Sequence, residues 1–210
     1  MKRLIPLVFA VLLLASCAAR VSYPTDDVYH RETDFQYGMR TMMNQRRMVE
    51  AEDGFYYIMF NHIFFIDKET MLPLPICTKP NCLHNLEERD SEKRKLCNAY
   101  VRSYFRSGPM AWWDGLLYVL ERNELEHTVL TQITPDGSKR KTAYDFGKWS
   151  EHSVNTAIIH RGVLYIVETE RTEGEQKTVI WAYSLDEPRQ KPRRIDEFKV
   201  EGSVAFTGLT

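Results

Sequence analysis

A short phrase recurs along the chain and constrains its fold more than any other sequence feature. It reads Asp-Gly-Leu-Leu-Tyr-Val-Leu at 114–120 and Arg-Gly-Val-Leu-Tyr-Ile-Val at 161–167, with an earlier version, Asp-Gly-Phe-Tyr-Tyr-Ile, at 53–58. A pair of turn-forming residues followed by alternating apolar residues is typical of a β-hairpin. Because the phrase repeats, the predicted unit of structure is a recurring module and not one irregular domain.

The spacing of the phrase predicts four strands in each module. Gly115 and Gly162 lie 47 positions apart, and a second turn pair, Asp136-Gly137, falls between them. Four strands joined by tight hairpins and repeated at this spacing are typical of a β-propeller blade. Besides the strand before each phrase, the strands expected in the three copies are 56–60, 63–66 and 72–76, then 116–120, 128–133 and 142–146, then 163–167, 178–183 and 194–198.

The predicted fold class is all-β, an incomplete β-propeller of about three four-stranded blades over residues 46–210. Three blades are too few to close a ring, and the next turn, at Gly208, is followed by only two residues. A half-hairpin there would leave an open sheet edge. We therefore expect this chain to be the N-terminal part of a longer protein. The alternative is an open or sandwich-like all-β domain in which the hairpins pair differently.

Residues 1–17 have the pattern of an export signal. Two basic residues precede an apolar run over 4–15, which is too short for a membrane-spanning helix. The run ends in Leu-Ala-Ser-Cys at 14–17, which resembles the lipobox of bacterial lipoproteins. The resemblance implies a lipid on Cys17 that anchors an extracytoplasmic protein to the bacterial cell membrane. A signal peptide with a chance cysteine is the alternative, and the polar segment 18–45 is expected to be a tether.

A polar insert between the first two copies, residues 77–97, carries three thiols and an imidazole. With Cys17 lipidated, three thiols remain, an odd number that disulfides cannot pair completely. Three thiolates and one imidazole form a standard closed set for structural zinc, with no open position for catalysis. A metal ion would also order a loop that has no core of its own. The predicted metal ligands are Cys77, Cys82, His84 and Cys97.

One disulfide is the alternative for this insert. Either Cys77–Cys82 or Cys82–Cys97 would form, leaving one free thiol and His84 at the surface. An extracytoplasmic location favours a disulfide, and the spacing of the cysteines matches no common zinc-finger pattern. The sequence leaves both possibilities open.

The insert also carries the most specific family resemblance in the chain. Residues 77–84 read Cys-Thr-Lys-Pro-Asn-Cys-Leu-His, and residues 97–100 read Cys-Asn-Ala-Tyr. Together they are similar to a signature of uncharacterised lipoproteins from Gram-positive anaerobes. The Asp-Gly-x-Leu-Tyr phrase likewise resembles TolB-like or domain-of-unknown-function propellers on exported bacterial lipoproteins. The resemblance implies a propeller on a lipid anchor, but it brings no biochemical function with it.

The rest of the sequence narrows the class of function. With 28 Lys and Arg against 29 Asp and Glu, no net basic field would recruit nucleic acid. No Gly-x-Ser-x-Gly nucleophile motif accompanies His152, which argues against a hydrolase triad. The segment Thr134-Pro-Asp-Gly-Ser lacks the spacer residue before glycine that sialidase-type turns contain, which argues against that class of glycosidase. Trp112 and Trp113 are expected to pack between blades, with at most one exposed as a platform for sugars.

We therefore predict a lipid-anchored binding or scaffolding module at the cell surface, with no catalytic activity in this portion. Its partners would be the membrane, through Cys17, and a glycan, peptide or protein ligand. Two alternatives stay open. One is a glycan-active enzyme whose catalytic carboxylates lie in missing blades. The other is a metal or redox sensor that uses the Cys/His cluster.

Overall fold

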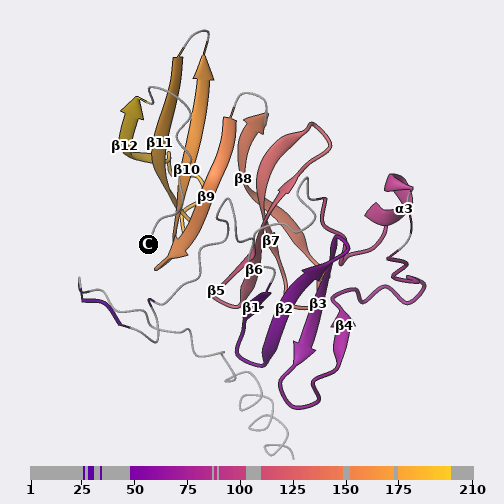
Figure 1. Ribbon diagram of the computed structural model, residues 1–210. Coiled ribbons are helices and arrows are strands. Elements are labelled where there is room, and N and C mark those ends of the chain that lie inside the picture. The colour runs from indigo at the N-terminus through magenta and orange to yellow at the C-terminus, as the bar shows by residue number, and fades with distance from the viewer. Residues whose placement is uncertain are drawn as a thin grey trace, which may run out of the picture.

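The described part of the chain folds into three antiparallel sheets in the computed structural model shown in Figure 1. The predicted export signal with Cys17, most of the segment 18–45, and Gly208 lie outside the described residues. The structure describes residues 26, 28–30, 34, 48–86, 88, 90–102, 110–148, 152–172 and 175–199.

Each sheet has four strands, and the strands lie in the sheet in the order in which they occur in the chain. All neighbouring strands pair in antiparallel fashion, so hairpins connect them. The first sheet contains β1 (Met48–Glu50), β2 (Gly54–Met59), β3 (His62–Asp67) and β4 (Pro73–Pro75). The second contains β5 (Met110–Trp113), β6 (Leu116–Arg122), β7 (His127–Ile133) and β8 (Arg140–Lys148). The third contains β9 (His152–His160), β10 (Val163–Thr172), β11 (Glu175–Ser184) and β12 (Arg193–Lys199).

This arrangement confirms the prediction of an all-β fold built from repeated four-stranded units. None of the three sheets closes on itself, because β1 and β4, β5 and β8, and β9 and β12 remain edge strands. One short helix, α3 (Ser91–Lys95), lies in the insert between the first and second sheets. Within the described ranges, no helix has both the length and the apolar character needed to cross a bilayer.

All three predicted phrase hairpins form, and two of them have two-residue turns. Asp114 and Gly115 both have positive φ, as do Arg161 and Gly162, which is the conformation of a two-residue type I′ turn. In the first copy the β1–β2 hairpin has a longer loop, because Glu50 pairs with Phe55 and Gly54 is already the first residue of β2. Gly54 is needed there for a different reason: a Cβ atom would lie 2.2 Å from the carbonyl oxygen of Ile66.

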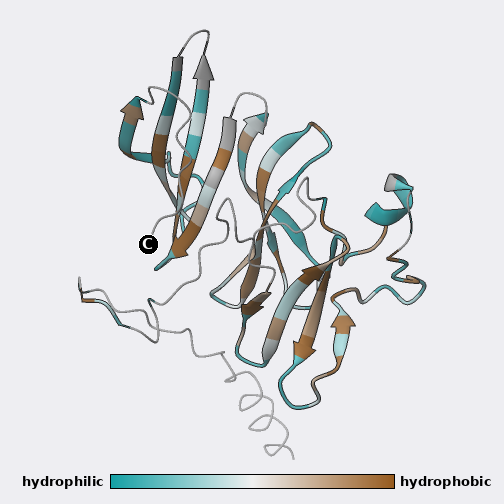
Figure 2. Ribbon diagram, in the orientation of Figure 1, coloured by the Kyte–Doolittle hydropathy of each residue, from teal (hydrophilic) through white to brown (hydrophobic). Residues whose placement is uncertain are grey.

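The second sheet is the middle layer of the molecule, and both of its faces are buried. Leu117 and Val119 of β6 point into a core shared with the first sheet, in which Tyr56 and Ile58 also lie. The alternating residues of the same strand pack into a second core, shared with the third sheet. Figure 2 shows apolar residues in brown on strands of all three sheets and polar residues in teal on α3. Burial on two faces explains why β6 is apolar at consecutive positions instead of alternating.

The first strands of neighbouring sheets are also in contact. β5 lies against β1 of the first sheet and against β9 of the third. In Figure 1 the three sheets follow one another across the molecule, and α3 lies on the side away from β9–β12. The sheets therefore stack side by side along one line of first strands.

Candidate metal centre

The four predicted ligand residues come together in the structure. Their ligand atoms, three Sγ atoms and one imidazole nitrogen, all lie within 4.8 Å of one another. The closest printed approach is 3.7 Å, between Cys97 Sγ and His84 Nδ1. Cys77, Cys82 and His84 are half-buried, whereas Cys97 is only 6% exposed. We call these four residues the Cys3His cluster.

A tight turn brings Cys77 and Cys82 together. Pro80 and Asn81 occupy its centre, and the N–H of Cys82 donates to the carbonyl of Lys79 at 3.2 Å. Cys77 follows directly after β4, and its N–H donates to the Pro75 carbonyl at 2.7 Å. The sequence between the two cysteines therefore has the proline and asparagine that such a turn favours.

His84 reaches the cluster through an unusual backbone conformation. Its φ is +47°, in the left-handed region that a residue with a Cβ atom rarely adopts. Such a conformation costs roughly 1–2 kcal/mol and persists only where other interactions hold it. The strain places Nδ1 beside the Cys97 sulfur, which is the contact that a shared metal ion would require.

The helix α3 delivers Cys97 from the other side. Asp90 caps the helix by accepting from the N–H groups of Glu92, at 2.9 Å, and Lys93. The N–H of Cys97 donates to the carbonyl of Arg94 at 3.0 Å, so the cysteine directly continues the last turn. The Lys79 ammonium also donates to the Leu96 carbonyl and links the first half of the insert to the second.

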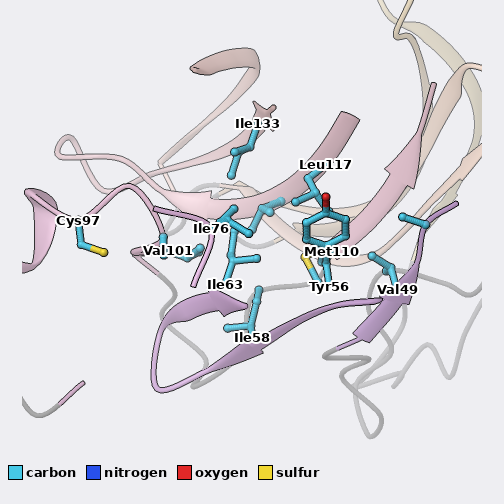
Figure 3. Packing of buried hydrophobic residues seen from close by; sticks show 13 residues of the cluster. Val49, Tyr56, Ile58, Ile63, Ile76, Cys97, Val101, Met110, Leu117 and Ile133 are labelled. Atoms are coloured by element: carbon cyan, nitrogen blue, oxygen red, sulfur yellow. The ribbon is translucent and has the colours of Figure 1, made fainter. Parts of the chain in front are cut away.

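The residues after Cys97 are anchored in the core between the first two sheets. In this exit segment, residues 98–101, Ala99 and Val101 are both fully buried. The Ile63 N–H donates to the Ala99 carbonyl, and the Val101 N–H donates to the Asn61 carbonyl, each at 2.8 Å. Figure 3 shows Cys97 and Val101 at one side of this core, beside Ile63. The cluster thus sits at the edge of the main hydrophobic core.

Arg140, the first residue of β8, holds the exit segment from the second sheet. Its guanidinium donates to the carbonyls of Asn98, at 3.0 Å, and Tyr100. A second nitrogen of the same group donates to both carboxylate oxygens of Glu121, at 3.0 and 3.2 Å. One side chain therefore satisfies two carbonyl groups and fixes the exit segment to a strand more than 30 residues later in the chain.

The surroundings of the three thiols differ in their electrostatic effect. Burial raises the pKa of Cys97 to about 12. Burial also acts on Cys77, but hydrogen bonds from the N–H groups of Lys79 and Asn98 outweigh it and lower the pKa of Cys77. The Asn98 N–H lies 3.4 Å from the Cys77 sulfur. The cluster therefore includes one sulfur that is surrounded by donors, as a thiolate ligand requires.

The donor set and its dimensions fit zinc. Zn–S bonds of about 2.3 Å and a Zn–N bond of about 2.0 Å give tetrahedral edges of roughly 3.5–3.8 Å. The 3.7 Å between Cys97 Sγ and His84 Nδ1 has this length. The longest separation, up to 4.8 Å, exceeds it by about 1 Å. Small side-chain rotations would close that difference, so these residues could hold a zinc ion as a closed structural site.

A cavity of about 740 Å³ adjoins the cluster, because Cys77 belongs to the cluster and also lines the cavity. Its walls come from the first sheet, from the chain after β4, and from the β7–β8 turn. Tyr56 and Phe65 are in contact there, with ring centroids 4.8 Å apart, and Asp53 and Asp136 lie on the same cavity. Next to these lining residues, Gly137 lies directly against Ile76, because a Cβ atom at this position would lie 1.8 Å from the Ile76 carbonyl oxygen.

Sequence reasoning identified the candidate ligands but missed the residues that position them. No local pattern points to Arg140, which acts through a long-range contact. His62 was missed as well: it begins β3 and is only 2% exposed. Its ring packs edge-on to Tyr100, and Nδ1 lies 2.9 Å from the Phe60 carbonyl. The signal for this position was its place between two apolar runs.

The two candidate tryptophans pack against the hydrophobic cores. Trp113 is buried in the core between the second and third sheets, and Trp112 stacks on Tyr56 at 5.3 Å. Both tryptophans therefore pack between sheets, as predicted.

We compared the chain with models of protein families, with curated proteins and with solved structures, and none of the three comparisons finds a match. The function proposed below therefore depends on the residues and geometry of this chain.

Proposed function

We propose that this protein is a lipid-anchored, extracytoplasmic binding module whose insert is held in place by a structural zinc ion. The convergence of Cys77, Cys82, His84 and Cys97 within 4.8 Å carries the zinc part of this proposal. Four protein ligands complete the coordination of zinc, so the ion would order the insert without taking part in a reaction. The lipobox at Cys17 supports the anchor.

The repeated sheets support a propeller-like arrangement as part of this proposal. Each sheet has its strands in sequence order, and the first strands of neighbouring sheets touch. A propeller places the first strand of each blade near its axis, where it meets the first strands of the adjacent blades. Additional blades of the same repeat would complete such a ring.

The cavity beside the cluster is where we propose that a ligand binds. Concave sites with aromatic walls and a few polar groups are typical of ligand binding. Ile76, Cys77 and Thr78 contribute one wall, so an ordered insert would also give this cavity a defined shape. Zinc would then support binding indirectly, by fixing the wall.

Metal analysis with thiol counting tests the zinc site. The full chain carrying Cys17→Ser, purified in detergent without added metal, should contain about one zinc per molecule. Cys82→Ser should lose that zinc, because three ligands hold zinc far less tightly than four. Leu83→Ser is the matched control, since its side chain lies between two ligands but is 90% exposed.

Two other results would contradict the proposal. A metal-free protein with two of its three thiols joined as a disulfide would make the insert a covalently closed loop. Zinc that survives Cys82→Ser would place the metal elsewhere in the chain.

A further inference from the structure

The two parts of the insert region are held to the sheets in different ways. The exit segment has fully buried side chains, two main-chain hydrogen bonds to residues 61 and 63, and Arg140 across its carbonyls. The insert before it is largely exposed: Leu83 is 90% and Leu96 is 66% exposed. The Cys3His cluster, together with Lys79 and the polar contacts of α3, connects this exposed part to the core.

The three thiols also differ in burial, one lying in the core and two at its border. Cys97 belongs to the buried core, together with Ala99 and Val101, and is 6% exposed. Cys77 and Cys82 are half-buried and pack against the border of that core. A small polar oxidant arriving from solvent would therefore reach Cys77 and Cys82 before Cys97.

We propose that the cluster is a peroxide-responsive switch, in which Cys77 and Cys82 join as a disulfide, the metal leaves, and residues 78–96 detach while the exit segment stays docked. This inference rests on the proposed zinc site. It adds a regulatory role that four fixed ligands alone would not imply.

The chemistry balances with hydrogen peroxide as the oxidant. Peroxide oxidises one thiolate to a sulfenic acid, transferring one oxygen atom and releasing hydroxide, which takes up a proton to become water. The second thiolate attacks the sulfenic sulfur, the S–S bond forms, and the departing hydroxide is protonated to a second water. Overall, two thiolates, one peroxide and two protons give one disulfide and two waters. Zinc is released unchanged as Zn²⁺, because only Cys97 and His84 remain as ligands.

The geometry favours pairing between Cys77 and Cys82. Their sulfur atoms are at most 4.8 Å apart, so reaching an S–S bond of about 2.05 Å requires a movement of less than about 3 Å. Cys82 can make this movement because it lies in an exposed turn. Cys97 is held by the Arg94 carbonyl behind it and by the buried exit segment ahead of it.

Peroxide treatment of the zinc-loaded full chain, carrying Cys17→Ser in detergent, tests this inference. A chromophoric chelator should detect about one zinc released per peroxide consumed. Peptide mapping should find a Cys77–Cys82 disulfide, with Cys97 still open to alkylation after unfolding. Hydrogen–deuterium exchange should rise over residues 78–96 and stay unchanged over 99–101, and a dithiol reductant with added zinc should reverse all three changes.

The measurement separates this inference from the proposed function. Zinc content before peroxide reports on the proposed function, and a chain without zinc at that stage overturns both. A chain that holds its zinc through peroxide, or that forms a disulfide to Cys97, overturns only the switch. Cys77→Ser reconstituted with excess zinc is the matched variant, since any disulfide that it forms within one chain must join Cys82 to Cys97.

Discussion

In the three sheets, each strand is paired with the strand next to it in the chain, whereas the segments outside the sheets depend on a few contacts with distant residues. The second sheet illustrates the first case: β5 to β8 pair in order, and both faces are covered by apolar side chains. The insert and the N-terminal residues around Asp34 illustrate the second. Regular pairing spreads stability over many weak interactions, while the added segments concentrate it in single side chains.

Asp34 is the clearest single-residue case. Its side chain is 1% exposed and accepts from two nitrogens of the Arg161 guanidinium, at 2.8 and 2.7 Å. The same guanidinium donates to the carbonyls of Asp26 and Val28. One arginine in the β9–β10 turn thus holds a segment that lies 127 residues earlier.

Removing core volume from the second sheet should have the largest effect. Leu117 is fully buried between Trp112 and Ile133, its partners on the two neighbouring strands. We expect Leu117→Ala to lower the free energy of unfolding by about 2–5 kcal/mol. Leu83→Ala in the insert, where the side chain is 90% exposed, should change it by less than about 0.5 kcal/mol. Urea denaturation measures both, and equal effects would break the distinction between sheet and insert.

Alanine substitutions at two glycines would separate the cost of an unfavourable backbone conformation from the cost of a steric clash. Gly115 and Gly137 have φ of +73° and +69°, but an added Cβ would meet nothing at Gly115 and the Ile76 carbonyl oxygen at Gly137. Gly115→Ala should therefore cost only about 1 kcal/mol, for its conformation. Gly137→Ala should cost a further 1–3 kcal/mol or so, because the turn must move away from Ile76. Thermal unfolding of the two variants side by side would show whether the β7–β8 turn packs as described.

Removing the Arg140 side chain should loosen the exit segment and leave the sheets intact. Arg140→Met loses the hydrogen bonds to the Asn98 and Tyr100 carbonyls, at a cost of about 1–3 kcal/mol. Hydrogen–deuterium exchange should rise over residues 97–101, with little change in β6 and β7. Lys141→Met, the exposed neighbour, is the control. A uniform rise throughout the second sheet would mean that Arg140 stabilises the sheet itself.

The smallest effect should be the pH dependence of the N-terminal contact. Hydrogen bonds from Arg161 lower the pKa of Asp34 below its usual value. A lowered pKa adds stability at pH values above about 4, and this stability is lost as the pH falls and the carboxylate takes up a proton. The difference in stability between the wild-type protein and Asp34→Asn should therefore be largest near pH 7 and narrow below about pH 4. A difference that stays constant over this range would show that the charge of Asp34 is unimportant.

How much the sequence revealed depended on the range of the interactions. The strands of the second and third copies could be predicted because alternation and turn residues are local signals, as in Leu116–Arg122 and in the Asp114-Gly115 turn. In the first copy the phrase also lies in the hairpin between the first two strands, but Glu50 pairs with Phe55, so the loop is longer although the pair at 53–54 looks the same in sequence. A two-residue turn of that sheet lies in the next hairpin, between β2 and β3, at Phe60 and Asn61, neither of which is a glycine. A turn with positive φ at such residues is stabilised by the strands on both sides.

The Cys3His cluster shows the same contrast between features that local sequence predicts and features that depend on distant residues. Cys77, Cys82, His84 and Cys97 were recognisable because thiols and an imidazole at short spacing have few other uses in a polar loop. What orients them was not recognisable, because Arg140 and Ile63 act on the insert from other parts of the sequence.

By itself, the sequence determined the all-β class, the repeat of four strands and the identity of the candidate metal ligands. These depend on residue type and near-neighbour spacing, which can be seen directly in the chain. Only the tertiary structure decided that the exit segment is buried between two sheets, that Arg140 holds it, and that Asp34 pairs with Arg161. These contacts join residues from 30 to more than 100 positions apart, and such pairs arise when apolar faces pack and bring distant polar groups within reach.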